Sequence, residues 1–179
     1  MSTLDTAALR DRQGPLKQRY RDDPDAAIVT VRAEGAFERD DEGVVSCTVQ
    51  GWSGPVRAGL HPSTGGDGED ACSGDMLLEA LVACAGVTLR SVATAMGLAV
   101  KQARLRATAT FDARGTLGVS RDVPVGCRGY RVVAELATDA DDAALARLAQ
   151  LTERYCVVGQ SLRDPVSVMV TRTDLVDRP

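Results

Sequence analysis

The chain has 179 residues, 44% of them hydrophobic, and carries 21 lysines and arginines against 25 aspartates and glutamates, a formal net charge of −4. This length and apolar content suit one substantial core, so a single domain is expected. The acidic balance leaves no basic stripe for phosphates and argues against nucleic acid or a membrane surface as a partner. The amino-terminal region lacks the apolar core of a signal peptide, and no run reaches the ~20 apolar residues of a membrane span. A cytoplasmic location is therefore expected.

The first 25 residues are polar with leucines at intervals, and Gly14 and Pro15 interrupt them. They predict a short helical segment and tail, and residues 26–179 are expected to form the single domain. Residues 28–37 and 43–52 then alternate apolar and polar side chains, which predicts a β-hairpin, and residues 55–60 add a possible third strand.

A loop rich in glycine and small polar residues leads into the longest apolar segment of the chain. From Met76 to about Gly97 the apolar residues recur at helical spacing, which predicts a buried helix long enough to cross the domain. Its expected buried stripe consists of Leu77, Leu81, Cys84, Thr88, Val92 and Ala95. Ser73 is expected to cap this helix, and Asp75 lies in its first turn, where a carboxylate favours the helix dipole.

The second half of the sequence repeats strands and then a helix. Residues 101–112 and 129–138 predict two strands, residues 142–155 a second core helix capped by Asp139 or Asp141, and residues 166–175 a last strand. Hairpins rather than single strands separate the helices, so the expected class is α+β with antiparallel sheets and two central helices.

The cysteines give no sign of a metal site or a disulfide framework. There are five of them, they are irregularly spaced and no CxxC occurs, so most are expected to be free thiols: Cys47, Cys72, Cys84, Cys127 and Cys156. The single histidine, His61, cannot supply a second nitrogen ligand, and no metal site is expected. Cys47, Cys72 and Cys127 are assigned no chemistry.

Cys84 lies in the middle of the long predicted helix, and two readings of it stay open. A cysteine in an apolar stripe is usually a passive packing residue, because burial raises its pKa. A reactive Cys84 needs a nearby cation, and the candidates in the first strands are Arg32, Arg39 and Arg57. Asp75 could orient such an arginine.

Cys156 follows the second core helix, whose carbonyl end disfavours a thiolate, although the next turn could offer amide donors. A thiol that is slow at rest suits a resolving role, in which it attacks an oxidised partner sulfur and closes a disulfide. Packing at the helix end is the alternative.

Two motifs resemble those of a known family. "SGDMLLEALVACAGVTL", preceded by "GGDG" and followed about seventy residues later by "RYCVVGQSL", is similar to the OsmC/Ohr family of cysteine-dependent hydroperoxide reductases. The resemblance implies an intertwined homodimer with the long helices packed between the sheets and active sites at the subunit interface. It also implies that Cys84 is the peroxidatic thiol and Cys156 the resolving thiol, and that no metal, haem or flavin takes part.

The implied cycle uses a peroxide substrate and an external dithiol reductant. The Cys84 thiolate attacks a peroxide oxygen, the resulting sulfenic acid forms a disulfide with Cys156, and the dithiol reduces that disulfide. The chain departs from the family pattern in having Gly74-Asp75 where a Pro-Glu pair is usual, and Val157 where proline often follows the second cysteine. Arg39 is the first choice for the activating arginine and Arg57 the second.

The sequence therefore leaves two functions to distinguish. The first is a thiol peroxidase acting on organic hydroperoxides or hydrogen peroxide, and it predicts an arginine within hydrogen-bond reach of the Cys84 sulfur. The alternative is a non-catalytic dimer of the same fold that binds an apolar small molecule between its helices, although an aromatic content of 3% offers few anchors for it. Either dimer is expected to bury more than ~2,000 Å².

Overall fold

The computed structural model describes residues 6–37, 45–51 and 54–173. The chain divides into two compact units, each described by itself below. Unit 1 combines residues 1–29, 80–108 and 129–179, and unit 2 combines residues 30–79 and 109–128. The expectation that residues 26–179 fold as one domain stays a prediction.

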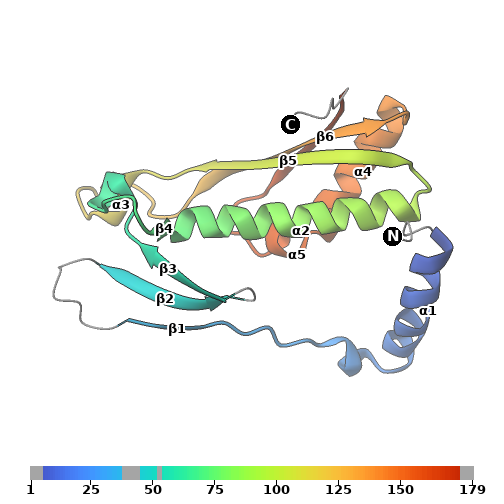
Figure 1. The fold of residues 1–179 in the computed structure, drawn as a ribbon, viewed down its shortest axis with the longest axis horizontal. Helices are drawn as coiled ribbons and strands as arrows, with labels where there is room; N and C mark the ends of the chain where they lie inside the picture. Colours follow the sequence, from blue (N-terminus) through green and yellow to red (C-terminus); the bar gives the residue numbers. More distant parts are fainter. Residues whose placement is uncertain (1–5, 38–44, 52–53, 174–179) are drawn as a thin grey trace. The chain divides into compact units, whose positions relative to one another are not determined.

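Helix α1 spans Thr6–Asp22 and is longer than the sequence suggested (Figure 1). The predicted break at Gly14-Pro15 is wrong, because Pro15 lies inside the helix. Pro15 removes one hydrogen bond of the helix but does not end it. The helix ends at Asp22, because Pro24 disfavours a helical conformation of the residue before it, and a short 3₁₀ turn follows at Pro24–Ala27. The Thr6 hydroxyl donates to the Thr94 carbonyl at 2.8 Å and so ties α1 to the long helix that carries Thr94.

Helix α2, Ser73–Ala95, is the predicted long helix and begins at the serine expected to cap it. It ends at Ala95, just before Gly97, which has φ +73°, a left-handed conformation that favours glycine. The Leu98 amide donates a hydrogen bond to the Ala93 carbonyl at 2.9 Å, as is typical of a helix that ends in a Schellman motif.

The buried stripe of α2 differs from the predicted one. The residues buried within the chain are Leu81, Ala85, Leu89 and Ala93, whereas Cys84 and Thr88 are only half-buried. Apolar residues lie on nearly every side of this helix, so periodicity alone did not select the correct face. Cys84 consequently lies beside the core and not at its centre.

By length and composition alone, α2 is apolar enough to cross a membrane, since an 18-residue window has a mean hydropathy of 1.6. The sequence analysis expected no such segment. The core helix of a soluble protein meets the same criterion, and 22% of this window is buried, with Leu89 in the core of unit 1.

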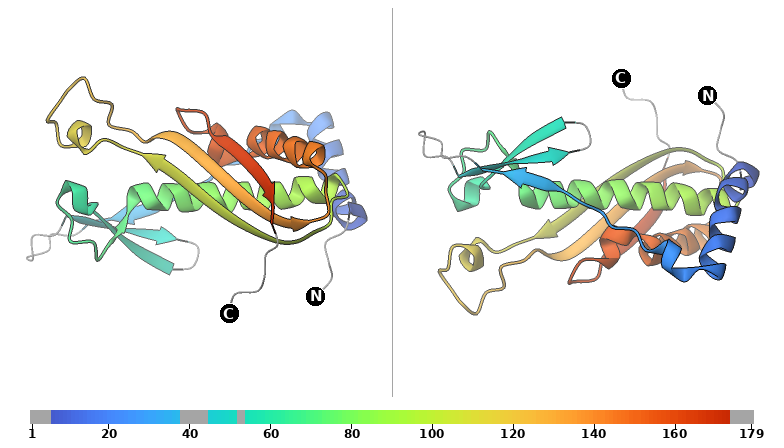
Figure 2. Two further views of the ribbon diagram at one scale, coloured as in Figure 1. Left: turned by 90° about the horizontal axis from the view of Figure 1, so that it is seen from above. Right: turned by 90° about the horizontal axis from the view of Figure 1, so that it is seen from below.

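A three-stranded sheet in the order β5-β6-β7 forms the other layer of unit 1 (Figure 2). The strands are β5, Val100–Thr110, β6, Arg128–Thr138, and β7, Ser167–Arg172. Strand β6 is central, and every second residue from Tyr130 onward is buried. This regular alternation is the pattern that predicted the strand.

The pairing of β6 with β7 is parallel, which corrects the expectation of antiparallel sheets. Helix α4, Asp142–Tyr155, and the short helix α5, Val157–Gln160, connect the two strands. A helical crossover returns the chain to the starting end of the sheet, so the next strand runs in the same direction. The mixed α+β class itself is confirmed.

The core of unit 1 lies between α2, the sheet and α4. Its fully buried members come from α2 (Leu89, Ala93), β6 (Ala134, Leu136) and α4 (Leu145, Leu148). Asp141, one of the two predicted caps, accepts a hydrogen bond from the Ala144 amide at 2.7 Å and begins α4. The core therefore fixes the helices that carry Cys84 and Cys156.

Unit 2 holds a four-stranded sheet in the order β1-β2-β3-β4. Its strands are β1, Glu34–Ala36, β2, Ser46–Gly51, β3, Gly54–Gly59, and β4, Ala71–Cys72. The predicted hairpin is confirmed in its antiparallel β1–β2 and β2–β3 pairs, although residues 28–33 form no strand, and β3 pairs with β4 in parallel. A short helix, α3, Ala113–Thr116, completes the unit.

Candidate two-cysteine site

Cys84 and Cys156 come together in unit 1, as the sequence analysis expected of a reactive pair. Cys84 lies midway along α2, and Cys156 lies at the junction where α4 ends and α5 begins. Both are free thiols. Cys156 is 2% exposed, whereas Cys84 is half-buried, so a small molecule reaches Cys84 more easily.

The Cys84 sulfur accepts a hydrogen bond from another helix. The Val158 amide, in α5, donates to it at 3.5 Å. Partial burial raises the pKa of Cys84, but hydrogen bonds from the Val158 amide and the Cys156 thiol lower it. The Val157 amide and the Thr88 hydroxyl lower it further, and the net result is a pKa below the usual value for cysteine.

The Cys156 sulfur is in the opposite electrostatic situation. Burial raises its pKa, and the Gly159 amide, which donates to the sulfur at 3.3 Å, only partly counteracts this. The neighbouring Cys84 raises the pKa of Cys156 further, because a negative sulfur there favours a proton on Cys156. Cys156 thus stays a thiol while Cys84 ionises first.

This arrangement supports thiol redox chemistry with divided roles. A thiolate is the nucleophilic form of cysteine, so Cys84 is the sulfur suited to attack. Cys156 is within hydrogen-bond reach and can attack Cys84 once Cys84 has been oxidised. Among the residues that the structure describes, no three histidine, cysteine, aspartate or glutamate side chains gather to hold a metal ion.

The other predicted site residues belong to unit 2 or lie outside the described residues. Arg39 is in the undescribed segment 38–44. Arg57 lies in β3 with its Nε 3.3 Å from a carboxylate oxygen of Asp70, and Arg32 is exposed in the extended segment before β1. Asp75 is exposed in the first turn of α2. An arginine at Cys84 and a role for Asp75 remain predictions.

Sequence reasoning missed two of the groups that act on the Cys84 sulfur. The Val158 amide acts through the backbone, which no side-chain motif identifies. Thr88 could have been found, because it lies four residues after Cys84 and residues at that spacing face each other on a helix. The expectation that the turn after Cys156 offers amide donors is confirmed by Gly159.

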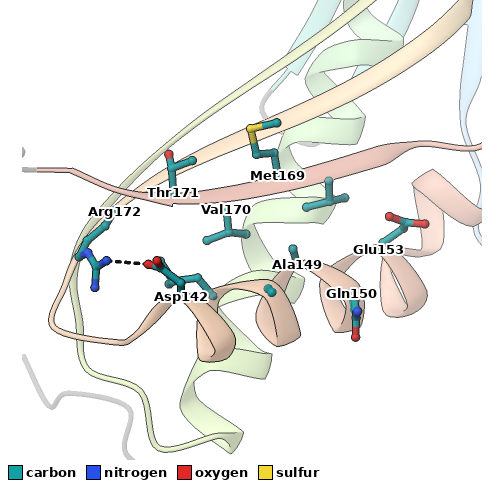
Figure 3. Close-up of a pocket in the computed structure, with 11 residues that line it drawn as sticks. Asp142, Ala149, Gln150, Glu153, Met169, Val170, Thr171 and Arg172 are labelled. Atoms are coloured by element: carbon teal, nitrogen blue, oxygen red, sulfur yellow. Dashed lines mark hydrogen bonds and ion pairs between the residues drawn. The ribbon is translucent and has the colours of Figure 1, made fainter.

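A separate groove of about 680 Å³ lies in unit 1 between α4 and β7 (Figure 3). Figure 3 shows Arg172 from β7 pointing to Asp142 at one end of the groove, where the two side chains form an ion pair of 2.6 Å. Ala149 and Glu153 line it from α4, and neither cysteine contributes to its walls. The groove is therefore distinct from the thiol pair.

A family model described as OsmC-like protein matches residues 66–171 of this chain. The match covers both cysteines and most of unit 1. A search of curated proteins by sequence found no significant match.

Several solved structures share the fold at low sequence identity. An OsmC-like protein from Mycoplasma pneumoniae is 14% identical, with a TM-score of 0.66 over 81% of this chain and 98% of its own. An organic hydroperoxide resistance protein from Elizabethkingia anophelis, with thiocyanate bound, is 12% identical, with a TM-score of 0.64 over 82% and 99%. The organic hydroperoxide resistance protein of Bacillus subtilis is 15% identical, with a TM-score of 0.55 over 82% and 100%.

Proposed function

Because this chain belongs to the OsmC-like protein family, we propose that it is a thiol-dependent peroxidase that reduces organic hydroperoxides or hydrogen peroxide. The resemblance found in the sequence is thereby confirmed at the level of family and fold. Two proteins that share the fold are organic hydroperoxide resistance proteins, and this supports the choice of substrate class.

One observation carries the proposal: two free thiols lie side by side, and successive backbone amides of α5, those of Val158 and Gly159, donate hydrogen bonds to the Cys84 and Cys156 sulfurs. The directions of the two pKa values agree with it, since that of Cys84 is lowered and that of Cys156 is raised. A peroxidase needs this difference, because one sulfur must be a thiolate at rest and its partner must keep a proton until later.

The cycle then runs in three steps. The Cys84 thiolate attacks one peroxide oxygen, the O–O bond breaks, and Cys84 becomes a sulfenic acid while the other oxygen takes a proton from solvent and leaves as an alcohol or water. Cys156 attacks the Cys84 sulfur, the S–S bond forms and the hydroxyl departs as water with the Cys156 proton. An external dithiol reduces this disulfide. The dithiol itself becomes a disulfide, and Cys84 and Cys156 return to their thiol forms.

The working form is proposed to be a homodimer. Helix α2 has apolar residues on the side that the chain leaves uncovered, among them Ala83 and Val87, and Val87 is 72% exposed. A second copy covering this side would remove apolar surface from water. The activating arginine, Arg39 or Arg57, is proposed to complete the site in that assembly.

The test compares Cys84→Ser with Cys156→Ser in peroxide consumption under a dithiol reductant. Cys84→Ser should abolish consumption, because a serine hydroxyl is not ionised near neutral pH and cannot take up the oxygen. Cys156→Ser should still consume about one peroxide per site and leave a sulfenic acid on Cys84 that a dimedone-type reagent traps. Cys127→Ser, at a half-buried loop cysteine, is the matched control and should behave as wild type.

Equal effects of the first two substitutions on the initial oxidation would contradict the assigned roles. A wild-type protein that forms no disulfide with peroxide would contradict the peroxidase and favour binding of an apolar ligand.

A further inference from the structure

A buried hydroxyl in α4 has no hydrogen-bond partner. Thr152 is fully buried, and among the described residues its Oγ1 is the one buried side-chain nitrogen or oxygen that contacts neither donor nor acceptor. An unpaired hydroxyl in the protein interior destabilises the folded state, whereas valine has a similar shape without that cost. The hydroxyl therefore points to a use in another state of the protein.

Thr152 lies one helical turn before Cys156. The Cys156 amide donates to the Thr152 carbonyl at 3.0 Å, so the helix is intact up to the cysteine. Residues four apart lie on the same face of a helix, and Cα–Cβ bonds tilt toward its amino end, which directs Cys156 back over Thr152. Thr152 belongs to the buried strip of α4, and Cys156, which caps the end of that helix, is also buried.

The environment of Cys156 changes during the proposed cycle. At rest its thiol donates a hydrogen bond to Cys84, and its sulfur accepts one from the Gly159 amide. Once Cys84 is a sulfenic acid, Cys156 must give up its proton at a site that is 2% exposed. A developing thiolate in such a place is costly unless protein groups donate hydrogen bonds to it.

We propose that the Thr152 hydroxyl turns to donate a hydrogen bond to the Cys156 sulfur as this sulfur loses its proton and attacks Cys84. The S–S bond forms, the S–O bond of the sulfenic acid breaks, and the hydroxyl leaves as water with the Cys156 proton. This inference rests on the proposed pairing of Cys84 with Cys156, but it holds for any oxidant that leaves a displaceable group on Cys84.

The first experiment separates the two chemical steps with one equivalent of cumene hydroperoxide. Sulfenic acid trapping measures the first step, and mass spectrometry measures disulfide closure. Thr152→Val should leave the first step unchanged and slow closure about tenfold or more, as expected for a lost hydrogen bond to a charged group. Thr152→Ser, which keeps the hydroxyl, should restore closure.

The matched control is the same substitution at another buried threonine. The Thr138 hydroxyl already donates to the Ala99 carbonyl at 2.6 Å. Thr138→Val should therefore lower the Tm and leave closure at the wild-type rate. Thr152→Val should keep or raise the Tm, because it removes an unpaired hydroxyl.

A second experiment needs no peroxide. Ellman's reagent places a thionitrobenzoate group on Cys84 in a background where the other three cysteines, apart from Cys156, are serine. Attack by Cys156 then releases thionitrobenzoate, whose absorbance reports closure. Thr152→Val should slow this release, and Thr152→Ser should restore it.

The outcomes separate the inference from the proposed function. If the wild type ignores peroxide but release still depends on the hydroxyl, the peroxidase fails and the inference stands. Release at the wild-type rate in Thr152→Val overturns the inference. The inference is also overturned if Thr152→Val slows sulfenic acid formation and disulfide closure equally and lowers the Tm. It is likewise overturned if Thr152→Ser does not restore closure, since each of these results assigns Thr152 a packing role only.

Discussion

The Val158 amide donates a hydrogen bond to the Cys84 sulfur at 3.5 Å, and the Val157 amide, the Cys156 thiol and the Thr88 hydroxyl also lower the pKa of Cys84. The sequence analysis expected that only a cation could offset the burial of this thiol. Neutral donors offset part of the effect of burial on the pKa of Cys84. They suffice for this because the sulfur is half-buried beside the core and is less desolvated than a sulfur at its centre. The arginine, if the assembly supplies it, adds to donors already in place.

The lowered pKa of Cys84 predicts how its reactivity depends on pH. The alkylation rate of Cys84 should rise with pH, with its midpoint below the usual pKa of cysteine, and level off above that midpoint. The midpoint of Cys156 should lie at a higher pH. Because the folded-state pKa is below the unfolded one, the thiolate's contribution to stability is present above the unfolded value and is lost as pH falls through the folded value. Iodoacetamide labelling read by mass spectrometry checks the order, and a reversed order would contradict it.

Thr88→Val tests the side-chain donor on α2. Removing the hydroxyl should move the alkylation midpoint of Cys84 upward and slow its reaction with peroxide near neutral pH, because the thiolate loses one hydrogen bond. Thr94→Val is the control on the same helix, since the Thr94 hydroxyl donates to the Arg90 carbonyl instead. An unmoved midpoint in Thr88→Val would remove Thr88 from the site.

Among the elements, the strands and helices with regular periodicity were predictable and the connections between them were not. Strand β6 and helix α4 lie where alternation and leucine spacing placed them. The sequence did not predict that α1 continues past Pro15, nor that β6 and β7 pair in parallel. Both depend on what the rest of the chain packs against these segments, which local patterns do not contain.

The start of α4 allows a direct test of an element-level assignment. Asp141→Ala should lower the free energy of unfolding by about 1 kcal/mol, because it removes the acceptor that satisfies the Ala144 amide. The measurement is urea denaturation followed by circular dichroism. Asp139→Ala, at the exposed alternative cap, should have a much smaller effect, and equal losses would show that neither residue acts as a specific cap.

For the molecule as a whole, the exposed side of α2 leads to the strongest expectation about assembly. Val87→Asp should shift the protein from dimer toward monomer in light scattering, because a charge would be buried among apolar side chains at the proposed interface. Val119→Asp, at a loop valine that is 70% exposed, is the matched control and should leave the mass unchanged. A wild-type protein that is monomeric would contradict the proposed dimer.

The candidate site could be predicted only in part, and the reason also lies at this scale. The motifs around Cys84 and Cys156 identified the pair, because the sequence holds both side chains. The donors that make the two sulfurs different come from α5, which was expected only as a short turn. Which arginine serves Cys84 depends on how separate parts of the chain, or of two chains, come together, and no local pattern encodes that.

The discontinuous make-up of unit 1 has a consequence for how the protein is synthesised. Helix α2 leaves the ribosome well before β6 and α4, the elements that bury Leu89 and Ala93. During that interval its apolar surface has no native partner, while the strands of unit 2 from β1 to β4 have already emerged. A nascent chain stalled before α4 should therefore bind holdase chaperones through α2, and release from them should await the synthesis of α4.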